Sequence, residues 1–197
     1  MLNESEAHSI TDIFCEFIEV AVHNILYIRK QYPQTIFECK RKYGIAVYHS
    51  IHPDVNEYIS NCIKAINFHL QRNQLRTVAL CFSSLGKIIE KYNFQVLNLN
   101  SYLESDPFLV KLEKFLSDFC LKLHSSVGCL DSLPGDSTFC IQLQVTEYSN
   151  LEFKQDPLYE NFSWVNFTCN EDVSSEIVPL HSIKTDSLNL QIYIEKI

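Results

Sequence analysis

The chain has 197 residues, of which 46% are hydrophobic and 20% charged, so its composition is that of a globular protein and excludes a disordered chain. The length predicts one compact domain. The formal net charge of -8 argues against a uniformly basic nucleic-acid clamp. No apolar run approaches the roughly 18 residues that would span a bilayer.

The first helix is predicted over residues 10–31, where apolar residues recur at steps of three and four. Pro33 ends the pattern because it cannot donate the next backbone hydrogen bond. Val20 and Leu26 lie off the main apolar stripe, so this helix is expected to be buried deep in the fold.

A short strand is predicted over residues 45–51, after a basic turn at residues 40–42. A second helix is predicted to begin at Pro53, a favourable residue for a first helical turn. The turn residues form a basic cluster with Arg29 and Lys30. We interpret this cluster as a solvated loop and expect no direct contact with nucleic acid, because the chain is acidic overall.

Two strands, over residues 77–82 and 88–99, are predicted to form a hairpin whose loop is residues 83–87. A third helix begins at residues 105–107, where a capping serine precedes an acid and a proline. A further strand is predicted over residues 138–146. Its apolar residues, Phe139, Ile141, Leu143 and Val145, fall on one face.

The last quarter of the chain holds most of the negative charge, since residues 151–197 carry eight acidic and three basic residues. Two short strand-like runs lie near residues 177–180 and 188–194. In the second, Leu188, Leu190, Ile192 and Ile194 alternate with polar residues and are expected to point inward. A long, weakly structured segment that ends in a strand suggests a segment that wraps around the domain.

The eight cysteines are expected to stay reduced. Residues 1–6 are acidic and lack the basic start and apolar stretch of a secretory signal. Five cysteines lie in apolar periodic segments and are predicted to be small core residues: Cys15, Cys62, Cys81, Cys120 and Cys140.

Catalytic and metal-binding patterns are weak in this sequence. It contains neither a glycine-rich phosphate loop nor a Cys-x-x-Cys pair. Cys120 with His124, or His49 with His52, could contribute metal ligands, but no third and fourth ligand is indicated. A buried thiol beside a solvated histidine is the simpler interpretation. We therefore expect no catalytic residues, no cofactor and no metal site.

Several segments carry a specific resemblance to a known family. They are residues 14–29, 32–33, 36–37, 42–43, 52–59, 177–180 and 187–195. Their residues resemble those of the HORMA-domain accessory subunits of translesion DNA polymerase zeta, which are mitotic-arrest-deficient-like proteins of the B type. The resemblance is dense from residue 14 to 66 and extends over essentially the whole chain.

The resemblance implies an α+β fold, in which a mixed or antiparallel sheet is backed by three helices. It implies a single HORMA domain over residues 1–197. The core would comprise about residues 1–149, and a C-terminal safety belt about residues 150–197. This arrangement is compatible with the order of elements predicted from the periodicity.

The resemblance also implies a non-enzymatic adaptor in the nucleus, with the cytoplasm and spindle as further locations. Such a subunit captures a proline-containing segment of the polymerase's catalytic subunit and docks the C-terminal domain of the translesion scaffold polymerase. One alternative is a HORMA checkpoint adaptor in mitotic control or DNA end protection. The other is an enzyme with a Cys/His site. The residues of the first helix favour the polymerase subunit, and the missing catalytic pattern disfavours the enzyme.

By resemblance, Tyr32, Tyr58 and Trp164 would line the peptide channel under the belt. Aromatic residues of this kind dominate the binding energy of such interfaces. The alternative for Tyr58 is a core residue, because it falls on the apolar stripe of its helix. The family has a proline before the tryptophan, where this chain has Ser163.

The resemblance places Ile177, Gln191 and Tyr193 on the outer face of the belt, where they would dock the scaffold polymerase. Strand alternation independently puts Gln191 and Tyr193 opposite the apolar face. The alternative is an ordinary solvated edge strand with an isolated tyrosine.

A family dimer surface, implied on the first and third helices, uses charged residues that this chain lacks. Lys30 replaces an acid, Cys39 a lysine and Ser117 an arginine. Without complementary charges to fix the contact, we expect a monomer or a dimer formed differently.

Overall fold

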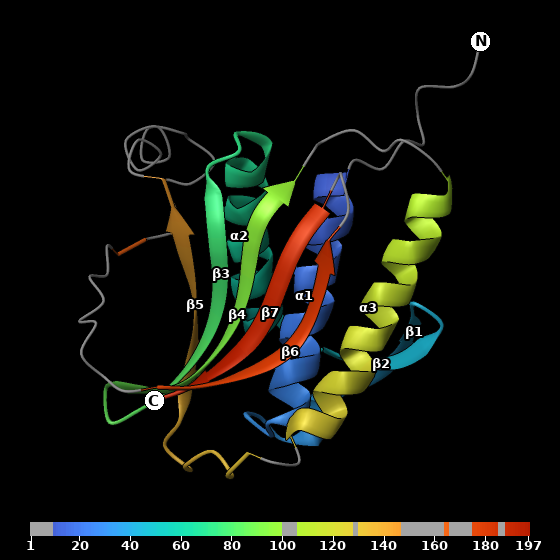
Figure 1. The fold of residues 1–197 in the computed structure, drawn as a ribbon. Coiled ribbons are helices and arrows are strands. Elements are labelled where there is room, and N and C mark those ends of the chain that lie inside the picture. Colours follow the sequence, from blue (N-terminus) through green and yellow to red (C-terminus); the bar gives the residue numbers. More distant parts are fainter. Residues whose placement is uncertain (1–9, 100–105, 128–129, 147–163, 166–174, 185–187) are drawn as a thin grey trace.

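The computed structural model describes residues 10–99, 106–127, 130–146, 164–165, 175–184 and 188–197 (Figure 1). Among them lie three α-helices, one short 3-10 helix and seven strands. In chain order these are α1 (Ile10–Ile28), η1 (Gln34–Ile36), β1 (Phe37–Lys42), β2 (Ile45–Ser50), α2 (Pro53–Gln71), β3 (Leu75–Ser84), β4 (Lys87–Leu99), α3 (Asp106–Val127), β5 (Thr138–Val145), β6 (Glu176–Lys184) and β7 (Leu188–Lys196).

Helix α1 is the centre of the helical layer and packs against α2, α3 and β2. The prediction that it lies deep in the fold is confirmed, since Val20 and Leu26 are buried along with the main apolar stripe. Helix α2 begins at Pro53, as predicted. Of the helices in the described part of the chain, none combines the length and apolarity needed to cross a membrane.

The main sheet has five strands in the order β5-β3-β4-β7-β6, and every pairing in it is antiparallel. The helices cover one of its faces (Figure 1). The α+β architecture predicted from the resemblance is confirmed. The prediction allowed a mixed or an antiparallel sheet, and the observed sheet is antiparallel. The C-terminal strand β7 lies beside β4, and β6 forms the edge beyond it.

The inward face of β7 is as predicted, because Leu188, Leu190, Ile192 and Ile194 are all buried. Both C-terminal strands extend further than their apolar runs suggested. The preceding part of the predicted belt lies mostly outside the described residues, as do Ser163 and the predicted helix-capping residue Ser105.

The basic residues 40–42 were predicted to form a turn, and this prediction is wrong. They belong to β1, which pairs with β2 from Phe37↔Ser50 to Lys42↔Ile45. The turn is Tyr43-Gly44, whose φ angles of 51° and 73° match a two-residue hairpin turn that needs positive φ at both positions. Exposed basic side chains suit an isolated two-stranded sheet because they discourage pairing with other strands.

The second hairpin also has a shorter loop than predicted. Residues 83–84 extend β3 and Lys87 begins β4, so the turn is Leu85-Gly86, with φ angles of 51° and 76°. Apolar alternation in the sequence stops before the strands end. The backbone pairing of β3 with β4 continues through the polar residues beyond it.

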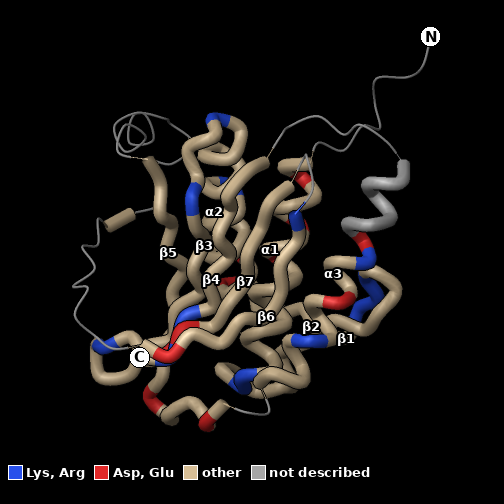
Figure 2. Tube along the Cα trace, viewed as in Figure 1, with Lys and Arg blue, Asp and Glu red and all other residues tan. Residues whose placement is uncertain are grey.

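The basic cluster does not behave as a single solvated loop. Arg29 is buried against Glu90, and this corrects its assignment to the loop. Lys40 and Lys42 are exposed and pair at 2.8 Å with Glu38 and with Glu16 of α1. In Figure 2 the basic residues of the β1–β2 hairpin lie at the periphery of the molecule.

The predicted core cysteines are largely confirmed. Cys15, Cys62, Cys81 and Cys120 are buried, whereas Cys140 is partly exposed. Cys140 belongs to β5, the edge strand of the described sheet.

Candidate protein-binding site

Strand β5 is one edge of the five-stranded sheet. The Ile141 N–H donates to the hydroxyl oxygen of Tyr58 at 2.9 Å. This backbone group therefore points away from the neighbouring strand β3 and toward the outer edge, where the side chain from α2 meets it. An extended chain can join such an edge by taking up backbone hydrogen bonds.

Tyr32 and Tyr58, both predicted to bind peptide, are brought together by a third ring. Phe139 of β5 lies edge-on to Tyr32, with centroids 6.1 Å apart, and edge-on to Tyr58 at 5.5 Å. Phe139 was missed as a site residue because alternation identifies the face of a strand but not what lies opposite it. Burial raises the pKa of both tyrosines, so both hydroxyls stay protonated at neutral pH.

The alternative interpretation of Tyr58 as a core residue is partly right. Its ring is half-buried and packs against the hydrophobic core, while its hydroxyl reaches the edge of β5. The same residue can therefore support the fold and present a group to the sheet edge.

Trp164, the third predicted peptide-binding residue, packs against α2 at a point further along the helix than Tyr58. It is partly buried and packs against the cluster of Ala65 and Phe68 on α2, as does Leu143 of β5. The guanidinium of Arg72 stacks 3.6 Å above the Phe68 ring and so lies behind this contact. The neighbour of the tryptophan, Val165, is 86% exposed. Tyr32 and Tyr58 thus meet at Phe139 of β5, and Trp164 packs on the same two α2 residues as Leu143 of β5.

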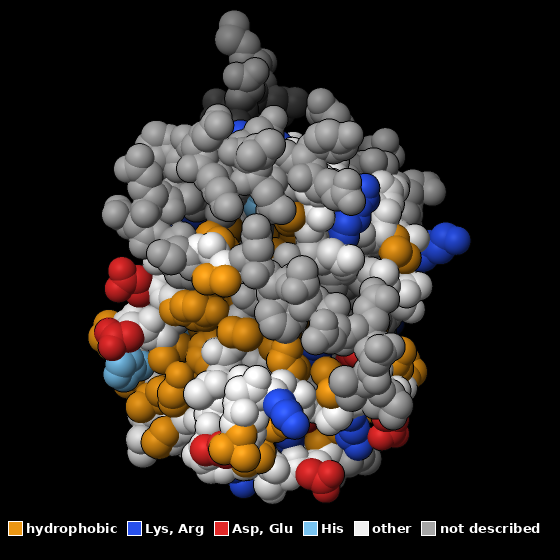
Figure 3. Space-filling model, turned by 90° about the vertical axis from the view of Figure 1, so that its left-hand side faces the viewer, with side chains coloured by type: hydrophobic (Ala, Val, Ile, Leu, Met, Phe, Trp, Pro, Cys, Tyr) orange, Lys and Arg blue, Asp and Glu red, His pale blue; other side chains and the backbone are white. Residues whose placement is uncertain are grey.

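Hydrophobic side chains gather on the side of the molecule where β5 lies (Figure 3). An apolar patch beside an open strand edge is typical of a surface that binds another polypeptide.

Ile177, Gln191 and Tyr193, the predicted scaffold-docking residues, lie together at the opposite end of the sheet. They line one shallow hollow of about 640 Å³, together with Gln95, Lys122, Pro179, Leu180, His181, Ser182 and Ile192. Ile177 is 62% exposed and Gln191 is exposed, whereas Tyr193 is half-buried. The register sets Tyr193 opposite Pro179 and Gln191 opposite Ser182. The outward direction predicted from alternation is confirmed.

The two pairs considered as metal ligands are not assembled as such. Cys120 is buried and His124 is exposed on α3. His49 lies beside His23 of α1, with ring centroids 4.0 Å apart, whereas His52 is exposed before α2.

Comparisons with known proteins agree with this fold. A family model described as the HORMA domain matches residues 11–107. Human mitotic spindle assembly checkpoint protein MAD2B is 31% identical over 193 residues, covering 95% of this chain and 90% of the human protein. DNA polymerase zeta subunit 2 of Drosophila melanogaster is 27% identical, covering 96% and 98%. A chain in a solved structure of the mitotic checkpoint complex has a TM-score of 0.80 at 21% identity and covers 95% and 98%.

The fold and these matches define a HORMA-domain protein. The chain belongs to the HORMA-domain family, and it is homologous over almost its full length to MAD2B and to DNA polymerase zeta subunit 2.

Proposed function

We propose that this protein is the non-catalytic adaptor subunit of a translesion DNA polymerase zeta in the nucleus. It captures a proline-containing segment of the catalytic subunit along the edge of β5. The observation that carries this proposal is the edge of β5, which among the described strands pairs only with β3 and has Tyr32, Tyr58, Phe139 and Trp164 near it. The relatives named as polymerase zeta subunits support the choice of partner.

The captured segment adds to β5 as a further strand. Its backbone takes up hydrogen bonds from groups such as the Ile141 N–H, and its prolines pack on the aromatic rings. The Tyr58 hydroxyl holds this N–H in the free protein and is displaced when the peptide binds. A proline in the peptide can pack against these aromatic rings. The peptide's other residues form the backbone hydrogen bonds to β5.

Residues 1–149 form the core of the domain and residues 150–197 its belt. Strands β5 and β6 lie at opposite edges of the sheet, four strand spacings or about 19 Å apart. The segment that joins these two edges is the proposed belt, and its residue Trp164 packs against Ala65 and Phe68 of α2. A peptide enclosed by this connection leaves only when the belt opens locally, so its dissociation is slow.

The hollow around Ile177, Gln191 and Tyr193 docks the C-terminal domain of the translesion scaffold polymerase. Ile177 supplies exposed apolar area, and Tyr193 offers a ring and a hydroxyl. The hollow is built by β6 and β7 of the belt, so the two binding events share one structural element.

A HORMA checkpoint adaptor in mitotic control or DNA end protection is the second candidate. The name of the human relative, a mitotic spindle assembly checkpoint protein, favours the mitotic role. Both candidates use the same peptide edge, and they differ in the partner that supplies the peptide.

Co-expression distinguishes the two candidates. The tagged chain is co-expressed with the catalytic subunit of polymerase zeta from the same organism, and protected segments are mapped by limited proteolysis and mass spectrometry. A stable complex with one protected proline-containing segment supports the polymerase subunit. Failure to form that complex, with recovery of checkpoint regulators from cell extract instead, would favour the second candidate.

A further inference from the structure

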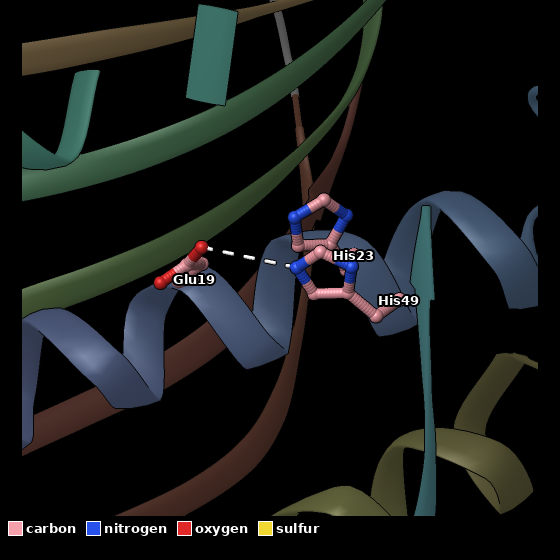
Figure 4. Close-up of side chains that lie close together, drawn as sticks. All are labelled: Glu19, His23 and His49. Atoms are coloured by element: carbon pink, nitrogen blue, oxygen red, sulfur yellow. Dashed lines mark ion pairs between the residues drawn. The ribbon is translucent and has the colours of Figure 1, made fainter. Parts of the chain in front are cut away.

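Three potential ligand side chains meet between α1 and β2, away from the peptide edge. Glu19 and His23 are four residues apart on α1 and so lie on the same side of the helix, and His49 reaches them from β2 (Figure 4). One donor atom from each residue lies within 4.8 Å of the other two. Sequence spacing does not indicate this set, because the two histidines lie 26 positions apart on different elements.

The cluster is open on one side and closed on the other. His23 is 1% exposed, whereas the side chains of His49 and Glu19 are 26% and 40% exposed. A small ion could therefore enter from solvent past Glu19 and His49 and reach His23 at the floor.

The hydrogen bonds fix which atom of His49 is available as a ligand. Its Nδ1 lies 2.7 Å from the carbonyl oxygen of Ser50, which can only accept, so Nδ1 carries the proton. This leaves the lone pair on Nε2, the atom that lies 3.9 Å from a Glu19 carboxylate oxygen. A backbone carbonyl that orients the second ring nitrogen is the usual support of a histidine ligand.

His23 is the buried member of the cluster and is held by the backbone of β2. Its Nδ1 accepts a long hydrogen bond of 3.3 Å from the Ser50 N–H, and a metal on either ring nitrogen would cost this contact.

The surrounding charge is balanced. Lys40 is close enough to act on His23, but its ammonium group pairs at 2.8 Å with Glu38. Glu19 adds a carboxylate directly at the cluster, so a divalent cation would not meet uncompensated positive charge.

We propose that Glu19, His23 and His49 form a binding site for a divalent transition-metal ion, with Zn²⁺ the best match. Two imidazoles and one carboxylate, with solvent in the fourth position, form a tetrahedral donor set typical of Zn²⁺. The bound ion links α1 to the β1–β2 hairpin. This inference does not depend on the proposed polymerase function.

Metal binding requires a small rearrangement. The two rings are inclined at 32° with centroids 4.0 Å apart, so their lone pairs do not yet converge. Zn²⁺ holds nitrogen and oxygen ligands at about 2.0–2.2 Å, which sets neighbouring donors roughly 3.3 Å apart. A tilt of His49 that keeps its Nδ1 on the Ser50 carbonyl, with rotation of the partly exposed Glu19, brings these donors toward His23. His23 gives up its long contact with the Ser50 N–H when it binds the ion.

The test uses Co²⁺ as a spectroscopic probe and Zn²⁺ as a competitor on the full chain. His49→Ala and Glu19→Gln remove ligands at partly exposed positions, and His52→Ala is the matched control, because His52 is exposed and outside the cluster. We expect a visible ligand-field band of tetrahedral Co²⁺ in the wild type and in His52→Ala. Zn²⁺ should displace it and raise the Tm by several degrees.

The ligand variants should lose at least about tenfold in affinity, and His49→Ala should lose the Tm shift. Three results would overturn the proposal. They are no Co²⁺ band in the wild type, an equal Zn²⁺ response in wild type and His49→Ala, and a sulfur-to-cobalt charge-transfer band, which would place the ion on cysteines instead.

Discussion

The guanidinium group of Arg29 and the carboxylate of Glu90 form a buried two-point ion pair. Nε lies 2.9 Å from Oε1, and Nη2 donates to Oε2 at 2.9 Å. Nη2 also donates to the carbonyl oxygen of Asp131 at 2.7 Å. The side chains are only 5% and 7% exposed, so the pair ties the end of α1 to β4 and to the segment before β5.

Breaking this pair from one side should be costly. Burial raises the pKa of Glu90 even though Arg29 opposes the shift, which indicates that desolvation outweighs the attraction. Arg29→Met leaves a buried carboxylate without its partner and should destabilise the protein by about 3 kcal/mol or more. The double variant Arg29→Met with Glu90→Leu should recover much of that loss. Urea denaturation measures the free energy of unfolding of the single and the double variant.

The exposed pair of Lys42 with Glu16 provides the control. Its 2.8 Å contact is as short, but its side chains are 46% and 47% exposed. Lys42→Met should cost less than about 1 kcal/mol. A double variant at Arg29 and Glu90 that is less stable than either single variant would contradict this account of the buried pair.

Trp164→Ala should weaken capture of a proline-containing peptide from the polymerase's catalytic subunit. We expect a loss of at least about 2 kcal/mol, or roughly thirtyfold in Kd, because large aromatic side chains supply most of the binding energy at interfaces of this kind. Calorimetry with a synthetic peptide measures the loss. Val165→Ala, one residue away and 86% exposed, is the matched control. Equal affinity of wild type and folded Trp164→Ala would rule out a role for this residue.

Tyr58→Phe keeps the ring and removes the hydroxyl that accepts from the Ile141 N–H. If the peptide displaces that hydroxyl, the variant should bind peptide up to about fivefold more tightly, which corresponds to one net hydrogen bond of about 1 kcal/mol. The Ile141 amide should exchange faster with solvent in the free variant. Tyr58→Ala should bind more weakly because it also removes the ring. Weaker binding by Tyr58→Phe would show that the hydroxyl contacts the peptide instead.

Tyr193→Ala should reduce affinity for the C-terminal domain of the scaffold polymerase, because this residue lines the hollow beside Ile177. Lys184→Ala is the control, since Lys184 is exposed on β6 but does not line the hollow. Peptide capture and docking share the belt, so each should strengthen the other by the same factor. Titrations with and without peptide measure this factor, and identical affinities would exclude coupling.

The chain alone should be monomeric in light scattering. Lys30 and Cys39 are exposed and Ser117 is partly exposed, so these three positions would bring no complementary charge pair to a dimer contact. A tight dimer that is disrupted by Lys30→Glu or Ser117→Arg would contradict this expectation.

The sequence by itself determined the elements that depend on local pattern. The three-and-four spacing located α1, although the helix ends at Ile28 and not at the predicted residue 31. Pro53 located the start of α2, and the alternation from Leu188 onward identified the inward face of β7. These features follow from the periods of the helix and strand, which any short window of residues contains. The family resemblance added the correct architecture.

Only the tertiary structure decided which residues meet. Lys40 became a strand residue because β1 pairs with β2, and Arg29 became a buried residue because Glu90, 61 positions away, lies opposite it. Phe139 joined Tyr32 to Tyr58, and His23 met His49, through the packing of separate elements. Periodicity assigns a side chain to a face, but its partner depends on strand register and helix packing, which are set by contacts far apart in the chain.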